Sequence, residues 1–146
     1  MTAKEFLNRG FKIGKRIESV LEEVRRLDAL TKSVTAVYGT EAVSRSRKTD
    51  SRENNIMRLM QAKSELEGLV DEMIRVEREI RRVTAAVPDV DCRLALELRY
   101  LNMNTWPEIQ LKLEKSKTQI HRIHNTALKM VGDVLTAEGG ENNVDR

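Results

Sequence analysis

Apolar residues recur along the first half of the chain at alternating spacings of four and three, the repeat of a helix that packs through one stripe. The first stripe has one polar member and consists of Ile13, Ile17, Val20, Val24, Leu27, Thr31, Val34 and Tyr38. The second stripe is uninterrupted and consists of Leu59, Ala62, Leu66, Leu69, Met73, Val76, Ile80, Val83 and Val87. Because neither helix can bury its stripe alone, we expect them to pair as an antiparallel hairpin, with another chain, or both.

The segment between the two stripes, residues 39–52, has no apolar period and is rich in Ser, Thr and basic residues. Its basic residues are Arg45, Arg47, Lys48 and Arg52. This composition predicts a flexible basic loop, which is either simply solvated or able to touch phosphates. Pro88 and Asp89 end the second long helix, since proline disfavours helix in the residue before it and Asp caps the next one. The coiled-coil-like hairpin is therefore expected to span residues 1–88.

Two short helices joined by a tight turn are predicted between residues 105 and 131. Thr105 and Glu108 form a capping-box pattern, in which the hydroxyl accepts from an early helical amide while the carboxylate reaches back. Ser116 and Gln119 repeat this pattern, and they predict where the second helix begins.

The second of these helices has one apolar face and one polar face. Its apolar residues lie on one side of a helix with 3.6 residues per turn, and they are Ile120, Ile123, Ala127, Leu128 and Val131. The other side carries Lys117, Thr118, His121, Arg122, Asn125 and Lys129. Arg and Lys can donate to guanine or phosphate and Asn can pair with adenine, so this face is suited to the major groove of DNA. The alternative is a helical hairpin whose polar face is only solvated.

The segment from Cys92 to Trp106 resembles the entry into the DNA-binding region 4 of bacterial sigma factors. It is more similar still to small phage proteins of the ArpU/RinA type, which are late transcriptional regulators with a region-4-like C-terminal part. The residues that match their pattern are Leu94, Leu98, Arg99, Tyr100, Leu101, Thr105, Trp106, Ile109, Ser116, Ile120, Arg122, His124, Ala127 and Leu128. The resemblance implies a three-helix helix-turn-helix unit over residues 89–131, behind a pair of long helices.

Two positions depart from that pattern. Gln110 stands where the pattern usually has alanine, at a point of close helix approach. Glu114 and Lys115 occupy the turn, which often carries glycine. We expect either a non-glycine residue with positive φ, at a cost of about 1 kcal/mol, or another turn geometry.

The composition agrees with an all-α protein and indicates the cellular environment in which we expect it. The chain has 146 residues, two Pro and seven Gly, and charged residues make up 34% of it, yet the net charge is only +3. A single cysteine, Cys92, excludes an intramolecular disulfide and favours a reducing cytoplasm. No apolar run approaches the length of a membrane span, so we expect no membrane partner. The polar, Gly-rich segment 132–146 predicts a disordered tail.

Catalytic and metal chemistry have little support in this sequence. It has no glycine-rich phosphate loop and no nucleophile with a plausible base, so we expect no enzymatic activity and no cofactor. His121 and His124 lack an acidic or cysteine partner at metal-ligand spacing, and His124 fits a hydrogen-bonded structural role beside the apolar face. Arg99 is expected to brace the helix junction, and Trp106 to pack beneath the two short helices.

These observations predict a cytoplasmic, sequence-specific DNA-binding regulator of phage or prophage transcription. The residues expected to contact double-stranded DNA are Lys115, Ser116, Lys117, Thr118, His121, Arg122, Asn125 and Lys129. One recognition helix reads only a few base pairs, so we expect homo-oligomerisation through the N-terminal helices, or help from host RNA polymerase. Two alternatives remain: an adaptor that binds host RNA polymerase or a sigma factor, and a DNA-recognising phage packaging subunit.

Overall fold

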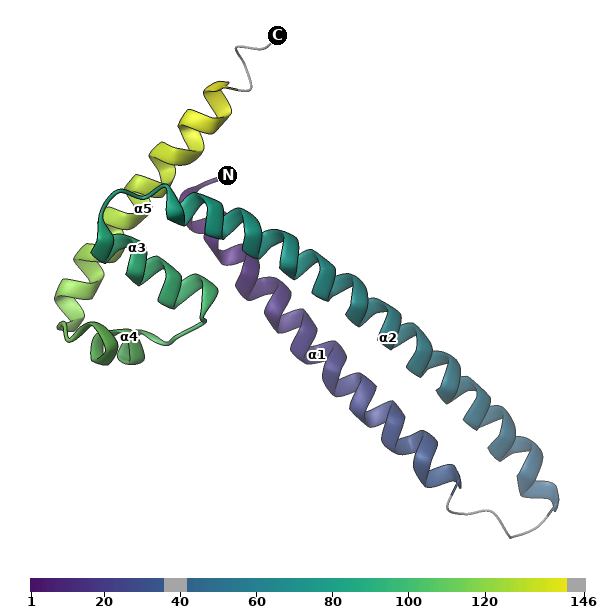
Figure 1. Ribbon diagram of the computed structural model, residues 1–146. Helices are drawn as coiled ribbons and strands as arrows, with labels where there is room; N and C mark the ends of the chain where they lie inside the picture. The colour runs from purple at the N-terminus through teal and green to yellow at the C-terminus, as the bar shows by residue number, and fades with distance from the viewer. Residues whose placement is uncertain (36–41, 142–146) are drawn as a thin grey trace. The chain divides into compact units, whose positions relative to one another are not determined.

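The computed structural model describes residues 1–35 and 42–141, and the side chains of residues 1–32 and 50–140 (Figure 1). Every element in these residues is helical, so the predicted all-α class is confirmed for them. In chain order the elements are α1 (Ala3–Thr35), α2 (Ala42–Ala85), α3 (Val90–Leu96), the π-helix η1 (Glu97–Leu101), α4 (Trp106–Leu113) and α5 (Lys117–Glu141). Within the described residues, no helix combines the length and the hydrophobicity of a transmembrane span.

The start of α1 is fixed by a capping box that the periodicity did not reveal. The Thr2 amide donates to Glu5 Oε2 at 2.8 Å, and the Glu5 amide donates to Thr2 Oγ1 at 3.2 Å. These bonds to the ionised carboxylate lower the pKa of Glu5. The helix therefore begins ten residues before Ile13, the first member of the predicted stripe, and buries Phe6 and Leu7 in its first turns.

The chain forms two compact units, of which one comprises Ile13–Glu72. Within it α1 and α2 run in opposite directions (Figure 1), and stripe residues Leu27, Leu59 and Ala62 form a buried cluster with Val24 against it. The polar member of the first stripe, Thr31, donates its hydroxyl to the Leu27 carbonyl at 2.8 Å. The described part of the two stripes is thus turned toward apolar neighbours, and the Thr31 hydroxyl is hydrogen-bonded.

The other unit combines residues 1–12 with the chain from Met73 onward. Its buried side chains come from the start of α1, the end of α2 and the three C-terminal helices, and include Leu7, Ile80, Val83, Val87, Leu96, Ile109, Ile120 and Val131. The predicted boundary lay between residues 88 and 89, whereas the two units divide within α1 and α2. The reason is physical: the ends of the long helices bury Phe6, Leu7 and Ile80 in the same unit as the C-terminal helices.

The predicted basic loop over residues 39–52 is largely helical, because α2 begins at Ala42. Arg and Lys are good helix formers, and no Pro interrupts the segment, so its lack of an apolar period did not prevent a helix. Residues 36–41 and the side chains of Arg45, Arg47 and Lys48 lie outside the described residues.

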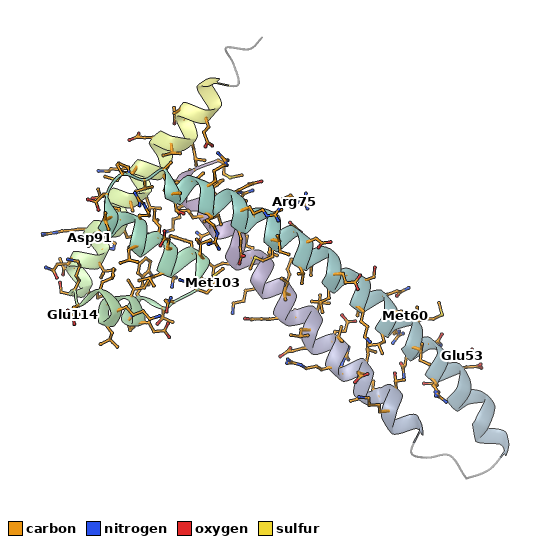
Figure 2. The ribbon with its side chains drawn as sticks, in the orientation of Figure 1. Glu53, Met60, Arg75, Asp91, Met103 and Glu114 are labelled. Atoms are coloured by element: carbon orange, nitrogen blue, oxygen red, sulfur yellow. The ribbon has the colours of Figure 1, made fainter. Side chains whose placement is uncertain are left out.

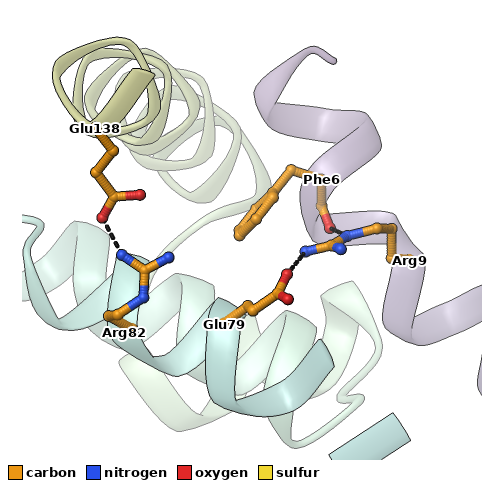
Figure 3. Close-up of polar contacts among 5 residues, drawn as sticks. All are labelled: Phe6, Arg9, Glu79, Arg82 and Glu138. Atoms are coloured by element: carbon orange, nitrogen blue, oxygen red, sulfur yellow. Dashed lines mark hydrogen bonds and ion pairs between the residues drawn. The ribbon is translucent and has the colours of Figure 1, made fainter. Parts of the chain in front are cut away.

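The predicted disordered tail is also wrong for most of its length, because α5 continues to Glu141. Val134 and Leu135 are half-buried and extend the inner face of this helix by one turn beyond Val131. Farther along, Glu138 forms an ion pair with Arg82 of α2, which Figure 3 shows. Contacts distant in sequence thus offset the poor helix propensity of the glycines. Residues 142–146 lie outside the described residues.

A second ion pair joins α1 to α2 in the same unit. Arg9 Nη2 lies 2.5 Å from Glu79 Oε2, and Arg9 Nε donates to the Phe6 carbonyl at 3.2 Å (Figure 3). The guanidinium also covers the Phe6 ring, 4.5 Å from its centroid. This side chain therefore orients the first turns of α1 against α2, although an ion pair that is only partly buried contributes about 1 kcal/mol.

Candidate nucleic-acid interface

Both predicted capping boxes are confirmed, so the chain itself sets where α4 and α5 begin. The Thr105 amide donates to Glu108 Oε2 at 3.1 Å, and the Glu108 amide donates to Thr105 Oγ1 at 3.4 Å. At the next helix the Ser116 amide donates to Gln119 Oε1 at 2.9 Å, and the Gln119 amide donates to Ser116 Oγ at 3.2 Å. The hydroxyl of Ser116 is therefore used to start α5.

The turn between α4 and α5 is tight and contains a residue with positive φ. Glu114 has φ 52° and ψ 45°, the left-handed conformation that usually selects glycine. Its amide donates to the Leu111 carbonyl at 3.4 Å, and the Lys115 amide donates to the Gln110 carbonyl at 3.1 Å. This is a Schellman arrangement, which satisfies the last carbonyls of α4 and lets α5 begin at Lys117. The first of the two expected turn geometries is thus the one that occurs.

The inner face of α5 is packed as predicted. Ile120, Ala127 and Val131 are buried, whereas Ile123 and Leu128 are half-buried. The buried residues on the other short helices are Ile109 of α4 and Cys92, Ala95 and Leu96 of α3. Burial raises the pKa of the Cys92 thiol to about 11, so the thiol is neutral at pH 7 and behaves as a small apolar group.

A cluster of aromatic side chains joins η1, α4 and α5. The Tyr100 hydroxyl and His124 Nε2 are 2.7 Å apart and hydrogen-bonded. The Trp106 ring meets the His124 ring edge-on, with 4.7 Å between centroids. His124 is only 8% exposed, so the predicted structural role of this histidine is confirmed.

The surroundings of His124 favour its neutral form. Burial is the main cause, and the positive charges of Lys4, Arg99 and His121 add to it, so the pKa of His124 falls to about 4. Burial also raises the pKa of its partner Tyr100. At pH 7 the pair is therefore an uncharged hydrogen bond inside the core, which links the end of η1 to the third turn of α5.

Arg99 braces the helix junction, as predicted. Its Nη1 donates to the Asn104 carbonyl at 3.0 Å, and its guanidinium lies 4.5 Å from the Trp106 ring centroid and 4.9 Å from that of Phe11. The sequence did not predict that the side chain of Asn104, whose carbonyl accepts the Arg99 hydrogen bond, is itself held by two further hydrogen bonds. Buried Asn104 donates from Nδ2 to the Leu98 carbonyl at 3.0 Å and accepts from Lys112 Nζ at 2.7 Å. No periodicity marks Asn104, because it lies between helices and its partners belong to η1 and to α4.

The predicted contact residues fall into two groups. Six of them are exposed along α5: Lys117, Thr118, His121, Arg122, Asn125 and Lys129. At about 100° per residue, these six occupy an arc of about 140°, whose centre lies about 120° around the helix from the centre of the buried residues, and Lys117 stands at the edge next to them. Lys115 and Ser116 precede the helix, with Lys115 half-buried in the turn and Ser116 exposed as the cap. The arrangement is a mostly polar surface with three cationic side chains, and half-buried Leu128 lies within its arc.

A surface hollow adjoins this polar face, and the sequence did not predict it. It has a volume of about 400 Å³ and is lined by Trp106, Gln110, Lys117, Thr118, Ile120, His121 and His124. Gln110 is among these residues. Its departure from the pattern of the phage regulators that the sequence resembles was the only signal of this hollow in the sequence. The lining offers an indole edge beside hydrogen-bonding groups, so the hollow can receive an apolar group next to the polar face.

A family model described as a protein of unknown function, DUF1492, matches residues 28–132. The chain belongs to this family. All eight predicted contact residues lie inside the DUF1492 match, as do the two capping boxes and the turn at Glu114. The family description assigns no activity or ligand. No curated protein matches the chain, and no solved structure does either.

Proposed function

We propose that this protein binds double-stranded DNA through the polar face of α5 and regulates transcription of phage or prophage genes. In this proposal α3 to α5 form a helix-turn-helix unit of the sigma-region-4 type, and α1 and α2 form a coiled-coil-like hairpin that brings two copies together. The observation that carries it is the exposed face of α5, with Lys117, Arg122 and Lys129 on one side of a helix that follows a tight, capped turn.

Each side chain on this face has a chemistry suited to a part of DNA. Arg122 can form two hydrogen bonds with a guanine edge, and Asn125 can do the same with adenine. Lys117 lies in the first turn of α5, where the positive end of the helix dipole adds to its attraction for phosphate. Lys129 lies three turns farther on and is assigned to the phosphate backbone, which positions the helix without reading sequence.

The proposal is tested by selecting duplexes from a random library with the full-length protein, and then measuring affinity for the selected duplex by fluorescence anisotropy. We expect Lys117→Ala/Arg122→Ala to lose most of this affinity. The matched control is Lys12→Ala/Arg26→Ala, which removes one exposed Lys and one exposed Arg from α1. If both double variants bind like the parent, or if no duplex is enriched, the polar face of α5 is not a DNA reader.

A protein-binding adaptor is the second candidate, and one observation favours it. Leu111 on α4 is 80% exposed, and Glu114 is exposed in the turn that follows. An exposed leucine beside a carboxylate suits a partner surface that is apolar with a basic edge, such as a subunit of host RNA polymerase. In that case Leu111→Glu abolishes co-elution with purified bacterial RNA polymerase, while the α5 double variant retains it.

A further inference from the structure

A second stripe of heptad spacing runs along α2, separate from the one that packs against α1. It consists of Ile56, Met60, Lys63, Glu67, Val70 and Ile74, at spacings of four, three, four, three and four. Met60, labelled in Figure 2, is 66% exposed, Val70 is 40% exposed and Ile74 is 45% exposed. Lys63 and Glu67 are also exposed, and Ile56 is half-buried.

The position of this stripe around the helix explains why its apolar members are not buried within the chain. At about 100° per residue, its centre lies about 100° around α2 from the centre of the stripe formed by Leu59, Ala62, Leu66, Leu69 and Met73. Leu59 and Ala62 already pack with Leu27 of α1. The second stripe therefore presents spaced apolar side chains that the helical pairing within the chain does not cover.

Apolar and charged positions in this stripe are arranged symmetrically about residue 65. Two apolar residues stand at each end, and the two central residues carry opposite charges. When two copies of α2 are laid antiparallel about a two-fold axis at residue 65, Ile56 faces Ile74 and Met60 faces Val70. Lys63 then faces Glu67 of the other copy, and this happens twice because of the symmetry. A parallel pairing instead sets Lys63 against Lys63 and Glu67 against Glu67, which is repulsive.

We propose that this stripe is a homodimer interface and that its occupant is the same stripe of a second copy, bound antiparallel. Charge complementarity selects both the partner and the direction, since only the antiparallel arrangement pairs each charge with its opposite. From Ile56 to Ile74 the contact is about 27 Å long, at 1.5 Å per residue. A single helix pair of this length belongs to the small class of interfaces, so we expect the dimer to be weak and reversible. The proposal does not depend on DNA binding.

Sedimentation equilibrium of the full-length chain, at concentrations up to about 200 µM, measures the dimer dissociation constant. We expect the parent to dimerise reversibly. Lys63→Glu alone and Glu67→Lys alone should each weaken the dimer by about tenfold or more, since two attractive pairs become two repulsive ones. The matched control is Arg26→Glu or Glu22→Lys, which reverses one exposed charge of an i,i+4 pair on α1 and leaves the stripe unchanged.

The decisive experiment mixes the Lys63→Glu and Glu67→Lys variants, each of which should dimerise weakly by itself. In an equimolar mixture, each chain of one variant meets opposite charges on a chain of the other, so a heterodimer should form with an affinity near that of the parent. The double exchange Lys63→Glu/Glu67→Lys should restore self-association in the same way. Circular dichroism of every variant checks that α2 stays helical.

Three results would overturn the proposal. They are a parent that stays monomeric over the whole concentration range, single reversals that behave like the α1 controls, and weakened variants that the mixture does not restore. The last result would indicate a different register or a parallel pair.

Discussion

The two compact units of this molecule are stabilised in different ways. The unit Ile13–Glu72 is held by repeated apolar contacts along two helices, such as those among Leu27, Leu59 and Ala62. The other unit also buries apolar residues, such as Ile80 and Leu96, but it adds a hydrogen-bonded cluster of Tyr100 and His124 that has no counterpart among the described residues of the unit Ile13–Glu72. A repeated stripe spreads its stability over many similar residues, whereas a unique cluster concentrates it. Single substitutions should therefore affect the two units unequally.

The largest expected difference comes from removing one leucine from each unit. Leu96 is fully buried, so Leu96→Ala should lower the free energy of unfolding by about 3 kcal/mol, through lost burial and the cavity left behind. Leu66 is half-buried on the stripe, so Leu66→Ala should cost about 1 kcal/mol. Urea unfolding followed by Trp106 fluorescence and by circular dichroism measures both, since Trp106 is the only tryptophan. If the two variants lost the same free energy of unfolding, the proposed difference between the two units would be contradicted.

Acid should destabilise the unit that contains His124 and leave the other less affected. The pKa of His124 is about 4 in the folded chain and 6.5 as its ordinary value, so the unfolded state binds a proton that the folded state excludes. Stability is then complete above pH 6.5 and falls as the pH drops toward 4, by about 2 kcal/mol between pH 7 and pH 5. Both histidines lie on α5, so the unit Ile13–Glu72 lacks this contribution.

The control for the acid effect is His124→Gln, which keeps a polar side chain but does not titrate. The fluorescence-detected stability of this variant should be lower at pH 7 and should change little between pH 7 and pH 5. An unchanged pH dependence would assign the acid effect to carboxylates instead.

Recognition by α5 should be separable from folding, because its outer and inner faces carry different residues. Under the proposed function, Arg122→Ala should cost about 1–3 kcal/mol in binding to the selected duplex and relax sequence preference at one position. Lys129→Ala should weaken binding to all duplexes alike and reduce the salt slope by about one. Anisotropy titrations at several salt concentrations distinguish the two. Both variants should keep the parent's urea midpoint, and a shifted midpoint would mean that the face is structural.

The smallest expected effect is a gain of stability at the turn. Glu114 has φ 52°, where a residue with a side chain is strained. Glu114→Gly should relieve this strain and raise the free energy of unfolding by up to about 1 kcal/mol. The greater conformational entropy of glycine in the unfolded chain offsets part of this gain. Glu53→Gly, at an exposed position in the first third of α2, is the opposite control and should lose about 1 kcal/mol. A loss at both positions would show that the Glu114 side chain stabilises the turn.

The features that the sequence predicted well are those set by neighbouring residues. The boxes at Thr105 and Ser116 and the stripe through Leu59 depend on residues within one or two turns. The features it did not predict depend on partners in other helices. The end of α5 is helical beside Arg82 of α2, 56 residues earlier in the chain. The partners of buried Asn104 are closer, six and eight residues away, but they lie in different helices and follow no helical period. The hollow beside Trp106 likewise exists only once α4 packs on α5.

The π-helical turn η1 has a consequence for how the length of this chain can vary. Its last bond runs from the Asn102 amide to the Glu97 carbonyl at 3.0 Å, spanning five residues where an α-helix spans four. A π-helical turn contains one residue more than an α-helical turn, and the helix continues through it. Removing one residue between Glu97 and Leu101 therefore leaves an ordinary α-helical turn, whereas removing one from the eight-residue α4 displaces its caps. Among related sequences, single-residue gaps should accordingly gather just before Asn102 and be rare between Thr105 and Ser116.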